Sequence, residues 1–159
     1  MTRSRPEHPD KAERSVQHTT ALTTQRVSAR LLALGYQVIR DDDGDLVGVW
    51  GEDRVWFLHM GKDEEILQVR GRWHRTLPPE QRAALLLATN DWNRTRIFPK
   101  AYVRTEAGRL VVYAEVSVDF GEGVTDDQLD SMIRRGLATS GALFTAIGQQ
   151  MVDETSGSQ

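Results

Sequence analysis

One stretch of the sequence, NDWNRTRIFPKAYV at residues 90–103, joins a strongly helical segment to a segment with the pattern of a strand. Trp92 continues the apolar stripe of the helix, whereas Asn90 and Asn93 fall off that stripe near the helix end. Side-chain amides at such an end can satisfy free carbonyls or backbone groups of the next strand. Pro99 forces the chain out of the helix, because the residue before a proline disfavours helical geometry. We therefore interpret Asn90, Trp92, Asn93 and Pro99 as a structural corner.

Hydrophobic periodicity defines the segments on either side of this corner. In order, the expected segments are a helix at 19–34, strands at 36–40, 46–50, 55–60 and 65–75, a helix at 77–93, a strand hairpin at 100–120 and a helix at 125–151. The second helix is expected to bury one stripe, formed by Ala84, Leu87, Ala88 and Trp92. Because hairpins outnumber helical crossovers, the order α-β-β-β-β-α-β-β-α predicts an α+β fold with helices packed on an antiparallel sheet.

The last expected helix opens on a capping box, Thr125 with Gln128, and its apolar face carries two small residues, Gly136 and Ser140. Glycine in the middle of a helix costs about 1 kcal/mol relative to alanine, so its presence there calls for a structural reason. The pattern predicts that the helix backbone closely approaches the sheet or a second helix. Gly136 and Ser140 are therefore candidates for close packing or for a dimer contact.

The chain has 159 residues, no cysteine and a formal net charge of −3. This length fits one domain that buries a core without disulfides or cysteine-based metal sites. Residues 1–18 and 152–159 lack periodicity and are expected to be disordered tails on a single domain at 19–151. The charge balance disfavours sequence-independent nucleic-acid binding, and the apolar runs are too short to cross a membrane. We therefore expect a cytoplasmic protein that contacts neither nucleic acid nor membrane.

No motif in the sequence indicates catalysis or a cofactor. Asp41, Asp43 and Asp45 are spaced like the start of a calcium loop, but the glycine is misplaced and a strand pattern follows, which favours a solvated hairpin turn. The histidines lack the spacing of metal ligands, and neither a Gly-x-Ser-x-Gly motif nor a glycine-rich phosphate loop occurs. We predict no cofactor, no metal and no catalytic residue, and we expect that the chain is not an enzyme.

Basic side chains cluster around two of the expected strands and form the best candidate surface for a partner or ligand. The members of this set are Arg70, Arg72, His74, Arg94, Arg96, Lys100 and Arg104. An arginine-rich sheet face can bind an acidic peptide or a phosphate. The alternative is a solvated face whose charge is balanced by Glu106, Glu115 and nearby acids.

Three segments, LLALGYQV, NDWNRTRIFPKAYV and GVTDDQLDSMI, together with the order of elements, resemble the YbjN domain family of bacterial proteins, especially its actinobacterial members. The likeness covers about 19–151, and the Asn-x-Trp-Asn segment that runs into Pro-Lys-Ala-Tyr is its most specific part. The resemblance implies a fold like that of type III secretion chaperones, with a twisted antiparallel sheet, flanking helices and frequent dimers. Members are described as sensory-transduction regulators, and the resemblance supplies no catalytic residue.

These observations lead to three hypotheses. The first is a non-enzymatic module that binds a protein or peptide, is a homodimer, and acts in bacterial signalling or stress regulation. The second is a regulator that binds a small anion or nucleotide on the surface of Arg70, Arg72 and Lys100. The third is an enzyme with an unfamiliar Asp or Glu acid–base site, which is disfavoured because no pair of acids is placed by its spacing in a cleft.

Overall fold

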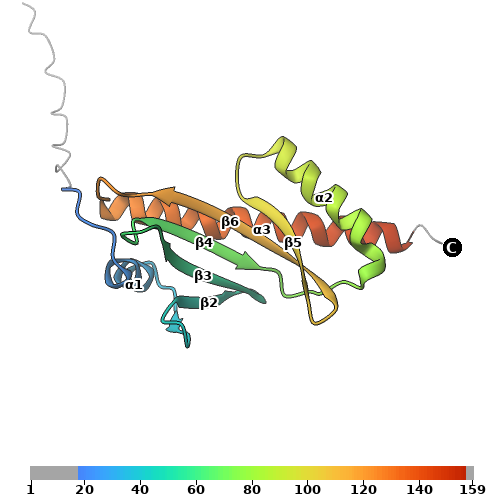
Figure 1. Cartoon of the computed structure of the whole chain (residues 1–159), viewed down its shortest axis with the longest axis horizontal. Coiled ribbons are helices and arrows are strands. Elements are labelled where there is room, and N and C mark those ends of the chain that lie inside the picture. The colour runs from blue at the N-terminus through green and yellow to red at the C-terminus, as the bar shows by residue number, and fades with distance from the viewer. Residues whose placement is uncertain (1–17, 157–159) are drawn as a thin grey trace, which may run out of the picture.

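The computed structural model describes residues 18–156, and their elements follow the expected order (Figure 1). The elements are α1 Thr24–Ala33, β1 Ile39–Arg40, β2 Leu46–Trp50, β3 Asp53–Met60, β4 Ile66–Arg72, the 3-10 turn η1 Pro79–Gln81, α2 Arg82–Thr95, β5 Lys100–Glu106, β6 Arg109–Asp119 and α3 Asp126–Ser156. The α+β fold expected from the sequence is confirmed.

Two element boundaries differ from those expected. α1 begins at Thr24 rather than at residue 19, because Thr23 caps it by accepting a hydrogen bond from the backbone N–H of Arg26. The described residues before this cap are not helical, and Thr20 forms an isolated bridge with Val124. At the other end, α3 continues past residue 151 to Ser156, so residues 152–156 prolong the helix. The rest of the expected tails, 1–17 and 157–159, lies outside the described residues.

The six strands form one antiparallel sheet in the order β1-β2-β3-β4-β6-β5. β1, β2 and β3 each pair with the next strand through a short turn, whereas β6 inserts between β4 and β5. The register places Glu115 of β6 between Arg70 and Lys100, and Tyr113 between Arg72 and Tyr102. One sheet edge is therefore the very short β1, and the other is the full-length β5.

All three described helices pack on one face of the sheet, and Figure 1 shows α3 running along its length. α1 and the first half of α3 cover β2, β3 and β4, where Leu31, Phe57 and Ile133 are fully buried. α2 and the second half of α3 cover β5, β6 and the end of β4, where Leu85 and Leu143 are fully buried. The opposite face of the sheet carries no described helix, and Arg70, Arg104, Tyr113, Trp56 and Leu58 lie on it.

The buried stripe of α2 is rotated relative to the expected one. Leu85, Ala88, Thr89 and Trp92 are buried, whereas the side chain of Leu87 is 71% exposed. The expectation for Leu87 was wrong because three consecutive leucines fit several helical stripes equally well, and only packing against β5 and α3 selects one.

The small residues of α3 approach the sheet of their own chain. Gly136 lies against Val69, while Ser140 lies beside Gly71, where a Cβ on Gly71 would be 3.2 Å from Ser140 Cβ. Both Gly136 and Ser140 are buried within the described chain. The close approach is therefore to the sheet, and this face of α3 is not available for contact with a second copy.

Candidate functional site

The corner at the end of α2 is held together by side chains that reach across to β5. Trp92 is buried, and its Nε1–H donates to the carbonyl of Pro99 at 3.2 Å. The amide of Asn93 bonds both backbone groups of Ala101, its Nδ2 to the carbonyl oxygen and its Oδ1 to the N–H, each at 2.8 Å. Asn90 is exposed and takes no part in these bonds. Three of the four expected corner residues therefore join α2 to β5, while Asn90 faces outward.

These bonds also show which backbone groups of β5 face away from the sheet. Because Asn93 takes both groups of Ala101, they point outward, and alternation makes those of Val103 and Thr105 point outward too. Leu110, the partner of Thr105 in β6, directs its backbone N–H and carbonyl away from β5. Both groups form hydrogen bonds with the backbone of Leu77, in the segment after β4. The β5 edge between Val103 and Thr105 therefore presents backbone donors and acceptors that β6 does not use.

On the uncovered sheet face, the arginines of β4 are matched to glutamates. Arg70 Nε lies 3.0 Å from Glu115 Oε1, and Arg72 Nη2 lies 2.9 Å from Glu106 Oε2. Arg70 also donates to Gln68 Oε1 at 2.6 Å. Arg70 and Arg72 are thus balanced by glutamates, as the alternative to a basic surface expected, and neither offers an unpaired positive charge to an anion.

Two tyrosines complete this network. Tyr102 and Tyr113 stack with ring centroids 5.4 Å apart, and their hydroxyls donate to Glu115 and Glu106 respectively. The hydrogen bond from Tyr113, together with the nearby Arg72, holds the pKa of Glu106 below its usual value. Burial and the hydrogen bond to Glu106 raise the pKa of Tyr113. The face is therefore a satisfied network of charges and hydroxyls.

The two cations of β5 lie on the same face, above its aromatic rings. Lys100 Nζ is 5.5 Å from the ring centroid of Tyr102, and Arg104 Cζ is 5.7 Å from that of Tyr113. An aromatic ring attracts a cation placed over its face, so the tyrosines hold both side chains.

The other expected cations lie elsewhere. Arg94, at the end of α2, pairs with Asp91 at 2.6 Å, and Arg96 stacks on Trp92 with 4.5 Å between Cζ and the ring centroid. His74 comes after the end of β4. The seven expected residues therefore divide among three places, because strand register orients Arg70, Arg72, Lys100 and Arg104 whereas a helix end orients Arg94 and Arg96.

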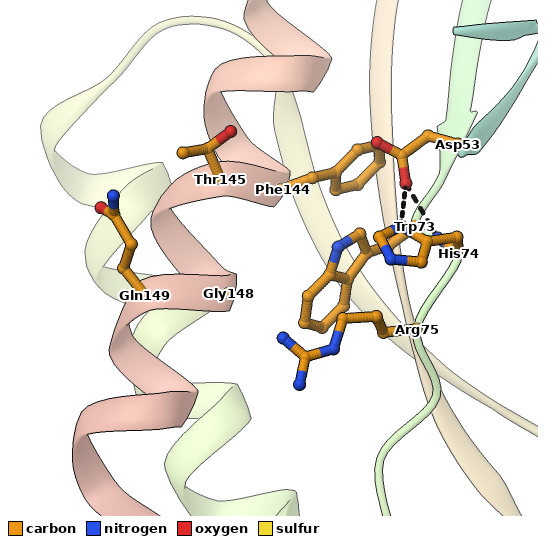
Figure 2. A pocket seen from close by; sticks show the side chains of 8 residues that line it. All are labelled: Asp53, Trp73, His74, Arg75, Phe144, Thr145, Gly148 and Gln149. Carbon is orange, nitrogen blue, oxygen red and sulfur yellow. Dashed lines mark hydrogen bonds and ion pairs between the residues drawn. The ribbon is translucent and has the colours of Figure 1, made fainter. Parts of the chain in front are cut away.

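His74 borders a groove between the end of β4 and α3, shown in Figure 2. The groove has a volume of about 620 Å³ and is lined by Asp53, Trp73, His74, Arg75, Phe144, Thr145, Gly148 and Gln149. Asp53 Oδ1 accepts the backbone N–H of His74 at 2.9 Å and lies 2.8 Å from His74 Nδ1. Trp73 is buried in the core, as its alternation predicted, and the sequence pattern did not indicate the groove beside it.

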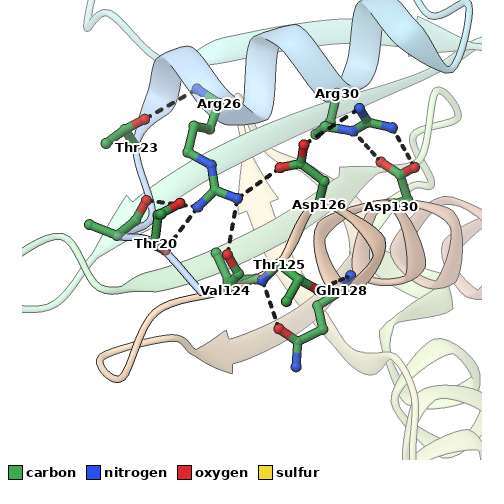
Figure 3. Close-up of polar contacts among 10 residues, drawn as sticks. Thr20, Thr23, Arg26, Arg30, Val124, Thr125, Asp126, Gln128 and Asp130 are labelled. Atoms are coloured by element: carbon green, nitrogen blue, oxygen red, sulfur yellow. Dashed lines mark hydrogen bonds and ion pairs between the residues drawn. The ribbon is translucent and has the colours of Figure 1, made fainter. Parts of the chain in front are cut away.

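A second polar cluster, missed by the sequence interpretation, joins α1 to the start of α3 (Figure 3). Arg26 donates to the carbonyls of Thr20 and Val124 and to Asp126, and Arg30 makes two 2.7 Å bonds to Asp130. The sequence shows two arginines four residues apart, Arg26 and Arg30, and two aspartates with the same spacing, Asp126 and Asp130. It does not show that these two pairs, about a hundred residues apart, contact each other.

The described residues contain neither a cluster of metal ligands nor a membrane-spanning helix. No group of three or more His, Cys, Asp or Glu within residues 18–156 could hold a metal ion. Asp41 instead accepts the backbone N–H groups of Asp43 and Asp45, which makes the expected hairpin turn. None of the helices in that range has the length and hydrophobicity required to span a bilayer.

Comparison with known proteins places the chain in a family. The YbjN family model, described as "Putative bacterial sensory transduction regulator", matches residues 23–149. The crystal structure of YbjN from E. coli has a TM-score of 0.68 and 14% identity, covering 84% of this chain and 96% of that one. No curated protein matches the chain.

Two further solved structures share the fold. The HopA1–SchA chaperone–effector complex has a TM-score of 0.50 and 15% identity, covering 76% of this chain and 91% of that one. An uncharacterized protein from Methanothermobacter thermautotrophicus has a TM-score of 0.51 and 12% identity, covering 81% of this chain and 99% of that one. The family match spans most of the sequence and agrees with the observed sheet and helices, and this chain therefore belongs to the YbjN family.

Proposed function

We propose that this chain is a non-enzymatic, chaperone-like regulatory module that binds a protein or peptide in the cytoplasm, and that the β5 edge receives the partner. The observation that carries the proposal is the outward direction of the backbone groups of Val103 and Thr105. A peptide in an extended conformation can pair with such an edge through main-chain hydrogen bonds. Edge strands of this kind are normally covered or paired in proteins.

The structural comparison supports this proposal at the level of the fold. One solved structure of similar fold is the HopA1–SchA chaperone–effector complex. The regulatory part of the proposal is supported by the description of the YbjN family. A fold can host several functions, so the β5 edge is the part of the proposal that experiments can address directly.

We further propose that the protein is a homodimer. Apolar side chains are exposed along α2 and just after it: Leu87 is 71% exposed and Ile97 is 88% exposed. Exposed apolar surface can mark a contact with another protein. Ile97 lies in the segment that leads from α2 into β5, so a second copy bound there would also cover part of the open edge.

The edge hypothesis is tested with two substitutions at one position. Affinity capture from the native host, with a chain lacking residues 1–18 as control, supplies partners, and purified partner segments are then titrated. Thr105→Pro removes the outward N–H without removing a bond to β6, so it should weaken binding at least about tenfold. Thr105→Ala keeps that N–H and should bind like the wild type. Equal affinity for both variants would exclude the edge as the site.

The dimer hypothesis is tested by light scattering over micromolar to millimolar concentrations. The wild type should reach twice the monomer mass, and Leu87→Glu with Ile97→Glu should remain monomeric. Leu32→Glu is a matched control, because Leu32 on α1 is 75% exposed but lies away from α2. A wild-type monomer throughout this range would refute the dimer.

Generic hydrolase screening that rises above background would refute the non-enzymatic part.

A further inference from the structure

The segment that forms α2 and β5 is strongly basic. Between residues 82 and 105 the sequence has five cations and one acid, although the whole chain has a formal net charge of −3. The acid, Asp91, pairs with Arg94 at 2.6 Å. The other four cations make no ion pair within residues 18–156; they are Arg82, Arg96, Lys100 and Arg104. The surroundings of the β5 edge therefore carry positive charge that the described chain leaves unpaired.

Two of these cations belong to the edge strand itself. Lys100 and Arg104 are exposed and lie at alternate positions with Tyr102, so both side chains lie on the uncovered face of the sheet. Each lies over a tyrosine ring, which holds the cation but does not cancel its charge. A strand added to β5 would place every second side chain next to them. Opposite charges in such cross-strand positions stabilise the pairing of strands.

The acids that border this surface do not pair with the cations of β5. Glu106 and Glu115 are each bonded by an arginine of β4 and by a tyrosine hydroxyl. Three aspartates of the turn before β2 border the same small hollow of the sheet face as Arg104, but none of them forms an ion pair with it in the described part of the chain. Lys100 and Arg104 can therefore pair with carboxylates from another molecule.

The helix side of the same edge is bordered by α2 and offers apolar surface. Asn93 bonds the outward backbone groups of Ala101, and Arg82 Nη1 donates to Thr105 Oγ1 at 3.3 Å, so α2 runs alongside β5 in the opposite direction. Helical spacing places Leu86 on the same side of α2 as Asn93, and the Leu86 side chain is 37% exposed. Side chains of an added strand that point toward α2 would therefore meet an apolar group.

We propose that the segment received at the β5 edge is an acidic peptide, with Glu or Asp at alternate positions beside Lys100 and Arg104 and with apolar residues between them, toward α2. This inference rests on the proposed function, because it names the class of partner for the same edge. Main-chain bonds to Val103 and Thr105 give affinity, and the alternating side chains give specificity. A polyanion without a peptide backbone cannot make these main-chain bonds.

The test titrates hexapeptides with blocked ends into the full chain and follows the backbone N–H signals of Val103 and Thr105 by proton–nitrogen NMR. The first peptide alternates Glu with Val, the second has Lys in place of Glu, and the third has Thr in place of Glu. The acidic peptide should shift both signals saturably. The basic peptide should bind at least about tenfold more weakly and the Thr–Val peptide about fivefold more weakly. A thymidine hexanucleotide should leave both signals in place.

Variants separate the role of charge from that of the edge. Lys100→Gln combined with Arg104→Gln should weaken binding of the acidic peptide about fivefold and leave the Thr–Val peptide unaffected. Arg54→Gln is the matched control, because Arg54 is also exposed and unpaired in the described chain and lies 5.7 Å from the Trp56 ring centroid, but on β3. Thr105→Pro should weaken binding of both peptides, since it removes an N–H that either one would use.

The outcomes distinguish the class of partner from the edge itself. Equal affinities of the acidic, basic and Thr–Val peptides, with both edge signals shifted, would overturn the acidic class and leave the β5 edge as the binding site. If no peptide shifts either signal, the acidic class and the edge are both wrong. The inference is also overturned if the Lys100→Gln, Arg104→Gln variant binds the acidic peptide as the wild type does, or if the hexanucleotide shifts the edge signals as the acidic peptide does.

Discussion

Gly136 of α3 lies directly over Val69 of β4, so close that a Cβ added to Gly136 would stand 2.6 Å from Val69 Cγ1. This contact sets the distance between the long helix and the centre of the sheet. It also explains a glycine in the middle of a helix, where glycine by itself is unfavourable. The contact leads to a prediction about two glycines of the same helix.

Gly136→Ala should lower the free energy of unfolding by about 1–3 kcal/mol, because the methyl group overlaps Val69 and overpacking outweighs the gain in helix propensity. Gly141→Ala is the matched control, since a Cβ at Gly141 meets nothing within 4 Å. That variant should be stabilised by up to about 1 kcal/mol. Urea unfolding measures both, and two changes of the same sign would contradict the packing argument.

Asn93→Ala should destabilise the protein by about 1–3 kcal/mol, because the backbone N–H and carbonyl of Ala101 each lose a 2.8 Å partner. Asn90→Ala, three positions earlier on an exposed site, should change stability by less than about 0.5 kcal/mol. Thermal or urea unfolding of the two variants checks this difference. Equal stability of the two alanine variants would show that Asn93 does not hold the corner.

The stability of the protein should fall as the pH drops below the usual histidine pKa. Burial lowers the pKa of His59, although Glu64 and Asp45 act in the opposite direction, and His59 Nε2 is buried without a hydrogen-bond partner. Because the folded state holds His59 neutral, the unfolded state takes up its proton first. The contribution of neutral His59 to the stability of the fold is therefore fully present above the ordinary histidine pKa of 6.5. It is lost progressively as the pH falls below that value.

The measurement is the free energy of unfolding in urea at several pH values on both sides of that point. His59→Leu cannot titrate, so its stability should depend less on pH in this range, by at most about 1.4 kcal/mol per pH unit for one proton. If wild type and His59→Leu have the same pH dependence, His59 is not the group responsible.

Tyr113→Phe should raise the pKa of the Glu106 carboxyl toward its ordinary value, because the hydrogen bond from Tyr113 is the largest cause of its depression. The lost bond should also cost about 1 kcal/mol of stability. A carbon NMR titration of the glutamate side chains measures the pKa. Tyr36→Phe is the control, since the Tyr36 hydroxyl lies outside this network, and it should leave Glu106 unchanged.

The secondary structure was largely predictable from the sequence because it depends on local patterns. Alternating residues in β4, with Leu67, Val69, Gly71 and Trp73 on one side, gave the buried face of the strand correctly. The capping box was also visible, and Thr125 and Gln128 make its two reciprocal bonds. Where the local pattern was ambiguous, as in the leucines of α2, the buried stripe was predicted incorrectly.

The candidate sites were less predictable, since they depend on which strands become neighbours. The insertion of β6 between β4 and β5 brings Glu115 and Glu106 to Arg70 and Arg72, and this pairs two of the four arginines and lysines of a face that looked basic in the sequence. The groove arises because Gly148, far along the chain, is packed opposite Trp73.

The sequence by itself determined the order of helices and strands, the polar corner after Trp92 and the need for a close approach at Gly136, because side-chain periodicity, capping and proline geometry act over a few residues. Only the tertiary structure decided which charges are paired and which backbone groups remain open at Val103 and Thr105. These properties depend on contacts between segments distant in sequence, whose distances and orientations no local pattern contains.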